Sequence, residues 1–197
     1  VAVPVVGRWF YTYLAFPDIK VHARFMHFPH TVASVEKEVR ERGHEEIMDI
    51  AKVVAKYNDL ILGGEYDEAF VKICGSIPRC IDLLVLFDMA REMPRKVYVI
   101  PHVDRPYMII DPMEDVTDRV WIVAPSPHDE IYTFHFALVT FSRPVNRYMA
   151  LDLAKRAMDK LISIARENWD VEDGYAEIVW DTETNDIDVV PIRGEGE

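Results

Sequence analysis

The chain of 197 residues contains no glutamine and only four asparagines, a shortage of heat-labile amides that is typical of thermophile proteins. Two cysteines, Cys74 and Cys80, are too few for a disulfide scaffold, a four-thiolate zinc site or an iron–sulfur cluster, so we expect buried thiols in a reducing compartment. No apolar run approaches the roughly 18 residues that a bilayer requires. The first ten residues lack the basic start and long apolar segment of a secretory signal. We therefore expect a soluble protein that is not secreted by a signal peptide.

The net charge of -12 is distributed very unevenly along the chain. The segment from 167 to 197 contains 11 of the 34 acidic residues and a single base, Arg193. The remaining residues therefore have a net charge of only -2. Acidity confined to one end does not exclude a basic surface elsewhere, so nucleic acid stays among the partners to consider.

The N-terminal part is predicted to contain an extended arm followed by helices. Residues 1–30 lack a helical period and combine prolines with many aromatic side chains, so we expect an arm that either completes its own core or wraps around a neighbouring subunit. From Thr31, a suitable N-cap, apolar residues recur every three or four positions, which predicts one long amphipathic helix that ends at Gly63-Gly64. A short helix from Glu65 to Cys74 follows.

A buried hairpin is predicted next. The run from Ile81 to Phe87 is apolar apart from Asp82, which is typical of a strand covered on both faces. The segment 97–103 is predicted to return beside it. Further predicted elements are strands at 119–124 and 131–141, a long helix at 144–169 and a hairpin at 175–190.

Together these elements predict an α/β (α+β) fold with a central mixed sheet flanked by two long helices. Three parts are expected along the chain. They are an extended N-terminal arm (1–30), an α/β core domain (31–169), and an acidic C-terminal hairpin and tail (170–197).

Asp82 is informative because burying an unpaired carboxylate costs several kcal/mol. If the predicted hairpin is symmetric about its turn, Asp82 lies opposite Pro101, with Ile100 and His102 as cross-strand neighbours. Two explanations stay open. The carboxylate either holds a metal ion or is bonded at a strand end to backbone amides or to Arg79.

The order of these residues resembles the RecB-type branch of the PD-(D/E)xK nucleases, in particular the CRISPR-associated RecB-like nucleases. The matching features are a helix with His44 and Glu45, then Gly75, then a strand with Asp82. The resemblance implies that His44 and Asp82 are remnants of a divalent-metal site. It also implies an inactive enzyme, because Ile100-Pro101-His102 stands where the family has Glu-x-Lys, and the cysteines of the family's iron–sulfur cluster are missing. We therefore expect no catalytic residues, no metal and no other cofactor. Equally, His44 fits a half-buried packing residue and Glu45 a solvated helix face.

Nucleocapsid proteins of certain filamentous archaeal viruses are similar to an inactivated member of this branch. That resemblance implies a non-enzymatic structural protein that binds double-stranded DNA and associates with itself, in a virion or in the host cytoplasm and not in a membrane. One alternative is an active metal-dependent nuclease that uses His44, Asp82 and a relocated acid, Asp104 or Asp111, near His102. The other is a protein-binding module whose acidic C-terminal region docks a basic partner.

The second long helix supplies the predicted DNA contacts. Between 143 and 166 it carries six bases against two acids, Asp152 and Asp159. Lysine and arginine neutralise phosphate charge without reading sequence, which suits a structural DNA-binding protein. The opposing interpretation is an ordinary surface helix in which Asp152 and Arg156 pair at the i, i+4 spacing. The predicted DNA-binding residues are Arg143, Arg147, Lys155, Arg156, Lys160 and Arg166.

Overall fold

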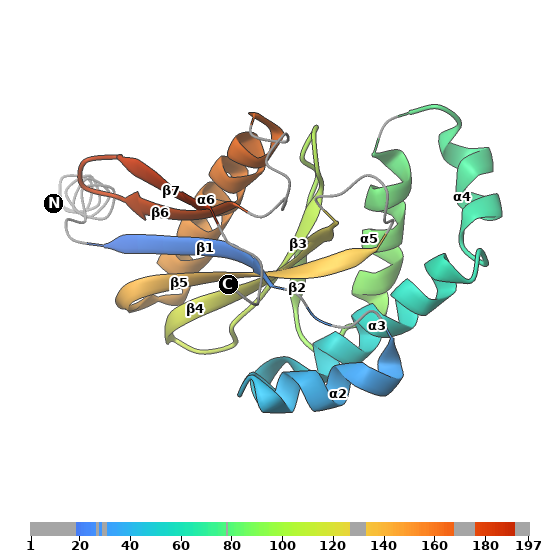
Figure 1. Ribbon diagram of the computed structural model, residues 1–197, viewed down its shortest axis with the longest axis horizontal. Helices are drawn as coiled ribbons and strands as arrows, with labels where there is room; N and C mark the ends of the chain where they lie inside the picture. The colour runs from blue at the N-terminus through green and yellow to red at the C-terminus, as the bar shows by residue number, and fades with distance from the viewer. Residues whose placement is uncertain are drawn as a thin grey trace, which may run out of the picture.

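The computed structural model describes residues 19–26, 28, 31–77, 79–126, 133–167 and 176–191. Within them a seven-stranded sheet is covered by helices on both faces (Figure 1). The strands are β1 (Lys20–Met26), β2 (Val97–Ile100), β3 (Tyr107–Ile110), β4 (Val116–Pro125), β5 (Phe134–Asn146), β6 (Ala176–Asp181) and β7 (Ile187–Pro191). The helices are α2 (Val32–Glu41), the short 3-10 turn η1 (Glu45–Ile47), α3 (Met48–Leu62), α4 (Asp67–Cys74), α5 (Cys80–Glu92) and α6 (Arg147–Glu167). The predicted α/β class is confirmed.

The sheet has the order β2-β3-β4-β5-β1-β6-β7, and every neighbouring pair is antiparallel. The expectation of a mixed sheet is therefore wrong. The physical reason lies in the connections: β2 to β5 and β6 to β7 are joined in sequence by short loops, which favour antiparallel neighbours. β5 is the longest strand and pairs with both β4 and β1, so it forms the middle of the sheet.

Alternate side chains of the strands enter two separate cores. On one face Ala137 and Val139 of β5 pack with the apolar stripe of α6, which includes Ala154, Met158 and Leu161. On the other face the neighbouring residues of β5 pack against α2, α3 and α5. The predicted helix at 144–169 is confirmed as α6, and the predicted strands at 119–124 and 131–141 fall in β4 and β5. No helix within the described ranges is both long and apolar enough to cross a membrane.

The run from Ile81 to Phe87 is helical and not a strand, so the predicted hairpin with 97–103 does not exist. Residues 80–92 form α5, whose buried positions Asp82, Val85, Leu86 and Met89 follow helical spacing. A continuous apolar run fits a buried helix as well as a buried strand, because its periodicity distinguishes neither. β2 pairs with β3 instead, so Asp82 does not face Pro101.

The single helix predicted from Thr31 to Gly63 is divided into α2 and α3. Gly43 has φ +76°, a left-handed conformation that ends α2, and the backbone N–H of His44 donates to the carbonyl of Val39. η1 then redirects the chain into α3. The predicted short helix after it is confirmed as α4. The break takes His44 out of a regular helix and places it just before η1.

Strands from all three predicted parts of the chain belong to one sheet. β1, from the expected arm, lies in the sheet between β5 and β6, with Val21 and Ala23 fully buried. The predicted C-terminal hairpin is confirmed as β6 and β7, and it continues the same sheet. Residues 1–18 of the expected arm lie outside the described residues.

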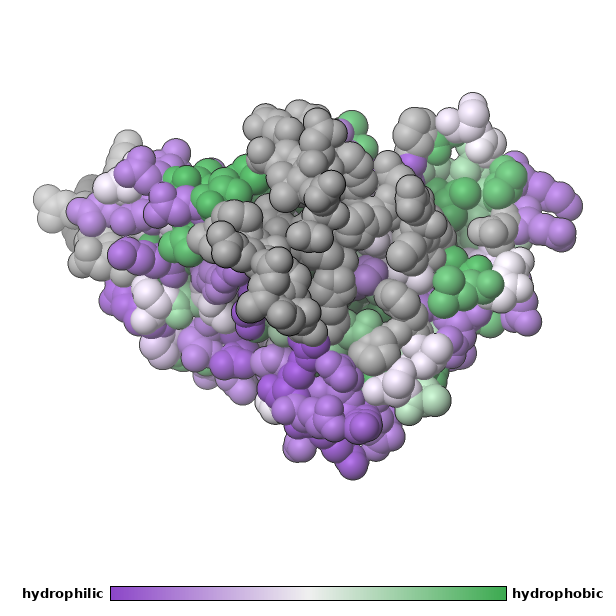
Figure 2. All heavy atoms as spheres, in the orientation of Figure 1, coloured by the Kyte–Doolittle hydropathy of each residue, from purple (hydrophilic) through white to green (hydrophobic). Residues whose placement is uncertain are grey.

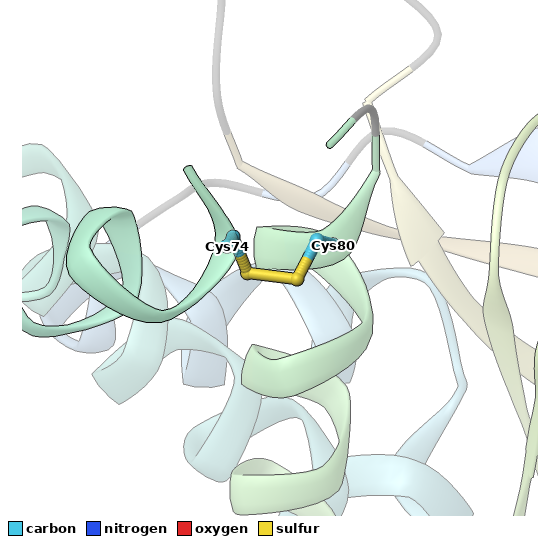
Figure 3. Close-up of a disulfide and its surroundings, with 2 residues drawn as sticks. All are labelled: Cys74 and Cys80. Atoms are coloured by element: carbon cyan, nitrogen blue, oxygen red, sulfur yellow. A yellow bond between two sulfur atoms is a disulfide. The ribbon is translucent and has the colours of Figure 1, made fainter. Parts of the chain in front are cut away.

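Cys74 and Cys80 form a disulfide, which corrects the expectation of two free thiols (Figure 3). The bond joins the last residue of α4 to the first residue of α5 across a Cα–Cα distance of 5.6 Å. Cys74 is 2% exposed. The sequence spacing did not reveal this pairing, because only the turn between the two helices brings the sulfur atoms together.

Candidate anion-binding site

Two of the six bases predicted to bind DNA, Lys155 and Arg156, pair with acids of the same helix. Arg156 Nε lies 3.2 Å from Asp152 Oδ2, and Lys155 Nζ lies 3.0 Å from Asp159 Oδ2. Both pairs have the i, i+4 spacing of an ordinary surface helix. A phosphate group would have to compete with these carboxylates, so α6 is not a free basic face.

The remaining predicted bases are dispersed. Lys160 Nζ lies 4.8 Å from the centre of the Trp180 ring, a cation–π contact with β6. Arg143 is an exposed residue of β5. Arg166 belongs to α6, but its side chain lies outside the described residues.

Arg147, the first residue of α6, is held in a structural ion pair with Asp111. Its Nε and Nη2 atoms lie 3.0 and 2.5 Å from the two carboxylate oxygens, and Tyr98 donates a third hydrogen bond at 2.9 Å. Burial alone would raise the pKa of Asp111, but the bonds from Arg147, the backbone N–H of Met113 and Tyr98 outweigh it and lower the pKa. Asp111 is completely buried, and both of its carboxylate oxygens are engaged by these hydrogen bonds.

The residues of the expected nuclease remnant are not brought together. Asp82 lies in the first turn of α5, 2% exposed, with Arg79 Nη1 3.2 Å from its Oδ2. Of the two explanations for Asp82, the ion pair with Arg79 is therefore the one that forms, although Asp82 lies on a helix and not at a strand end. Glu45 is exposed at the start of η1. Across the described parts of the chain, no three histidine, cysteine, aspartate or glutamate residues are grouped so that they could hold a metal ion.

His102, near which a relocated metal site was considered, forms hydrogen bonds with the neighbouring backbone. His102 Nδ1 accepts hydrogen bonds from the N–H groups of Asp104 and Arg105, at 3.1 and 3.2 Å, and so stabilises the turn between β2 and β3. The alternative of a relocated metal site, with Asp104 or Asp111 beside Asp82, finds both Asp111 and Asp82 engaged elsewhere, by Arg147 and by Arg79.

His44 has a different setting, in which three arginines face it. Its side chain is 14% exposed and packs edge-on against Trp121 and Phe28, with ring centres 4.9 and 6.4 Å away. Arg24 of β1, Arg42 at the C-terminal end of α2 and Arg119 of β4 all lie close enough to disfavour a charge on its ring. We call Arg24, Arg42 and Arg119 the arginine cluster.

Strand register explains how the arginine cluster forms. On the sheet face opposite α6, Arg24 pairs with Leu138 of β5, and Leu138 pairs in turn with Trp121 of β4. Two residues away on the same strands, His22 of β1 pairs with Thr140 of β5, and Thr140 pairs with Arg119 of β4. Because residues i and i+2 of a strand share a face, β1 and β4 project their arginines to the same side across β5.

The cluster is only partly neutralised by acids. Arg42 Nε lies 2.8 Å from Glu38. Arg119 pairs with two acids, since its Nη1 lies 3.5 Å from Glu46 and its Nε lies 3.4 Å from Asp118. Arg24 forms no ion pair with any described residue, and its buried Nε atom lacks a hydrogen-bond partner there. Burial lowers the pKa of His44 first of all; Glu46 raises it, and the three arginines lower it further. Three carboxylates, those of Glu38, Glu46 and Asp118, thus lie beside Arg42 and Arg119, whereas Arg24 has no acidic partner among the described residues.

A pocket of about 600 Å³ adjoins the cluster at Arg119. Trp121 and Glu46 form part of its wall, where Trp121 Nε1 donates to Glu46 Oε1 at 3.1 Å and Arg95 donates to the backbone carbonyl of Glu46. The side chain of Arg119 is 41% exposed, so it is accessible from this side. The complete lining is Glu46, Arg95, Ile110, Asp111, Pro112, Met113, Glu114, Thr117, Asp118, Arg119, Val120 and Trp121.

Sequence reasoning did not find this cluster, because its members come from three elements separated by up to 95 residues. One local signal was present: in the stretch KVHARFM the polar residues Lys20, His22 and Arg24 alternate with apolar ones, which indicates a strand with one polar face. No family model matches the sequence, no curated protein matches it, and no solved structure matches the fold.

Proposed function

We propose that the chain is a non-enzymatic DNA-binding protein that contacts the phosphate backbone through the arginine cluster. The observation that carries the proposal is Arg24, a half-buried guanidinium without an acidic partner among the described residues, directed to the same face as Arg119. A buried charge is normally paired, and the guanidinium group matches the geometry of a phosphate as well as that of a carboxylate.

DNA is still the partner that we propose, as the sequence suggested, but we place its binding site at the arginine cluster and not on α6. Of the predicted α6 bases, Lys155 and Arg156 are paired with Asp159 and Asp152, whereas Arg24 of the arginine cluster has no acidic partner among the described residues. The resemblance to RecB-type nucleases relied on Asp82 as an acid in a strand, but Asp82 lies in helix α5. We therefore base the proposal on the cluster; an inactivated RecB-like scaffold and a role as a virion nucleocapsid stay predictions.

The test compares two variants that each remove two positive charges. Arg24→Gln with Arg119→Gln alters the cluster, and Lys155→Gln with Arg156→Gln alters α6. Affinity for a DNA duplex is measured by fluorescence anisotropy between 50 and 200 mM salt. Loss of two phosphate contacts is expected to reduce the slope of log K against log salt by about 1.8 for the cluster variant, while the α6 variant stays close to wild type. Circular dichroism confirms that both variants are folded.

If the α6 variant lost more affinity and salt dependence than the cluster variant, DNA would bind at α6 and not at the arginine cluster. A wild-type protein that binds no duplex at 50 mM salt would refute the proposal. Incubation of linear DNA with the protein and Mg²⁺ or Mn²⁺ tests the non-enzymatic part. Cleavage that tracks the protein through purification would contradict it.

His44 provides a second readout of the same site. A bound phosphate offsets the field of the arginines and so raises the pKa of His44, which means that binding takes up a proton. Affinity is therefore expected to increase as the pH falls from 8 to 6, and to increase less in His44→Gln. An identical pH dependence in both proteins would show that phosphate binds elsewhere.

A further inference from the structure

The pocket beside Arg119 has the size and the surroundings of a site for a polar ligand. Its volume of about 600 Å³ lies within the roughly 300 to 1,000 Å³ that small-molecule sites occupy. Figure 2 shows hydrophilic residues gathered over α2, the helix that ends at Arg42 of the arginine cluster. This side of the molecule therefore suits a polar partner such as nucleic acid.

Two irregularities of the backbone shape the wall of the pocket. The pairing of β4 with β5 shifts between Thr117 and Arg119, where Thr117 Oγ1 donates to the carbonyl of Arg119 at 2.9 Å and accepts its N–H at 3.2 Å. Met113 has φ +59°, which is rare for a residue with a side chain, and Asp111 Oδ1 accepts its N–H at 2.9 Å. Bulges redirect side chains, and such backbone outliers gather at ligand sites. Both features in one wall support a ligand site and not an accidental gap.

The polar groups of the pocket are only partly used by the protein itself. Arg95 donates to the backbone carbonyl of Glu46 and forms no ion pair with any described residue. The contacts of Glu46 with Trp121 and Arg119 both use Oε1, and its Oε2 has no hydrogen-bond partner in the described part of the chain. Asp118 likewise uses Oδ1 for Arg119 and leaves Oδ2 without a described partner. The pocket therefore offers one guanidinium donor and two carboxylate acceptors.

Guanine matches this set of groups better than any other base. Its Watson–Crick edge carries the acceptor O6 followed by two donors, N1–H and the amino group, so Arg95 can donate to O6 while Glu46 and Asp118 accept from the donors. Adenine and cytosine present an amino donor where guanine has O6, and thymine has a second acceptor where guanine has its amino group. This edge is accessible only in an unpaired base, because a duplex uses it for pairing.

Arg119 links the pocket to the arginine cluster. It belongs to the cluster, it lines the pocket, and its side chain is 41% exposed. A phosphate group bound by the cluster at Arg119 therefore lies beside the pocket, where a base of the same strand can enter.

We propose that the pocket binds one unpaired guanine base of a DNA strand whose phosphate is held by the arginine cluster. The inference rests on the proposed function, because the phosphate contact brings the strand to the pocket. It adds a substrate class, single-stranded DNA that contains guanine, and assigns recognition of the base to Arg95, Glu46 and Asp118.

Fluorescence anisotropy at 50 mM salt measures binding of the full-length chain to short adenine strands that carry one central guanine, thymine or abasic position. Wild type is expected to bind the guanine strand about 5-fold or more tighter than the other two, since matched base contacts discriminate at least that much. Annealing each base-containing strand to its complement is expected to abolish the difference between guanine and thymine, because the base edge is then occupied.

A double variant separates base recognition from phosphate binding. Glu46→Gln with Asp118→Asn is expected to remove the preference for guanine, yet to increase affinity for the abasic strand, because two acids no longer compete for Arg119. Retained binding of the abasic strand also shows that the variant is folded. The matched control, Glu36→Gln with Glu92→Gln, removes the same charge from two residues that do not line the pocket, and its guanine preference should equal that of wild type.

Equal affinity of wild type for the guanine, thymine and abasic strands would overturn the inference and leave phosphate binding intact. A guanine preference that persists in the pocket variant, that is lost in the control variant, or that survives in the duplex would overturn it as well. Failure of every strand to bind at 50 mM salt would instead refute the proposed function, and this inference with it.

Discussion

Removing the Cys74–Cys80 disulfide should reduce stability by an amount that follows from the length of the loop it closes. The two cysteines are six positions apart. The loss of loop-closure entropy from the unfolded chain is then worth about 2 kcal/mol at 25 °C. For a chain of this size, each kcal/mol corresponds to about 2 to 4 °C in Tm, so Cys74→Ala with Cys80→Ala is expected to melt about 4 to 8 °C lower.

The assay is urea unfolding, followed by circular dichroism, of four samples: oxidised wild type, wild type treated with a phosphine reductant, and the double variant without and with the reductant. Reduced wild type should match the variant, and the variant should not respond to reductant. Thiol titration in denaturant should find no free thiol before reduction and both afterwards. Free thiols in freshly purified protein, or an unfolding free energy that reductant leaves unchanged, would refute the reasoning.

Three further outcomes test the packing and the polar contacts. Asn58→Ala removes two hydrogen bonds to the backbone of Phe134, at 3.0 and 2.8 Å, and should cost about 2 to 3 kcal/mol in urea unfolding. Met158→Ala, at a fully buried position under the sheet, should cost about 3 kcal/mol because it leaves a cavity. Asp111 has a pKa lowered from 3.8, so the stability that it contributes with Arg147 is present above that pH and lost as pH falls through the lowered value. Asp111→Asn should therefore be less stable than wild type at pH 7 and differ from it less in strong acid, as thermal melts across pH would show.

Elements with a clear period could be predicted from the sequence. The stripe Ala154, Met158 and Leu161 marked α6, and the β-branched and aromatic residues of 134–141 marked β5, because burial of one face imposes the spacing in both cases. The prediction for residues 81–87 was wrong for the opposite reason. This run is apolar on nearly every side, so neither a helical nor a strand period is visible in it. Only the length of α5 in the structure, 13 residues, distinguishes a helix from a strand.

The candidate site was beyond prediction from local sequence. Arg24, Arg42 and Arg119 meet only because β1 enters the sheet next to β5, and no local pattern specifies that pairing. The basic helix was visible as a charge count, but whether Lys155 and Arg156 are free depends on side-chain pairing within α6. Charge totals therefore located basic residues without showing which of them are already neutralised.

The place of β1 in the sheet has a consequence for folding on the ribosome. Its two neighbours, β5 and β6, are encoded more than 100 and more than 150 residues later, as the pairs Val21 with Phe141 and Val21 with Trp180 show. β1 must therefore stay unpaired until β5 has been synthesised, and it gains its second neighbour only when β6 follows. Contacts of such long sequence separation slow folding, and the waiting strand is a natural target for chaperones.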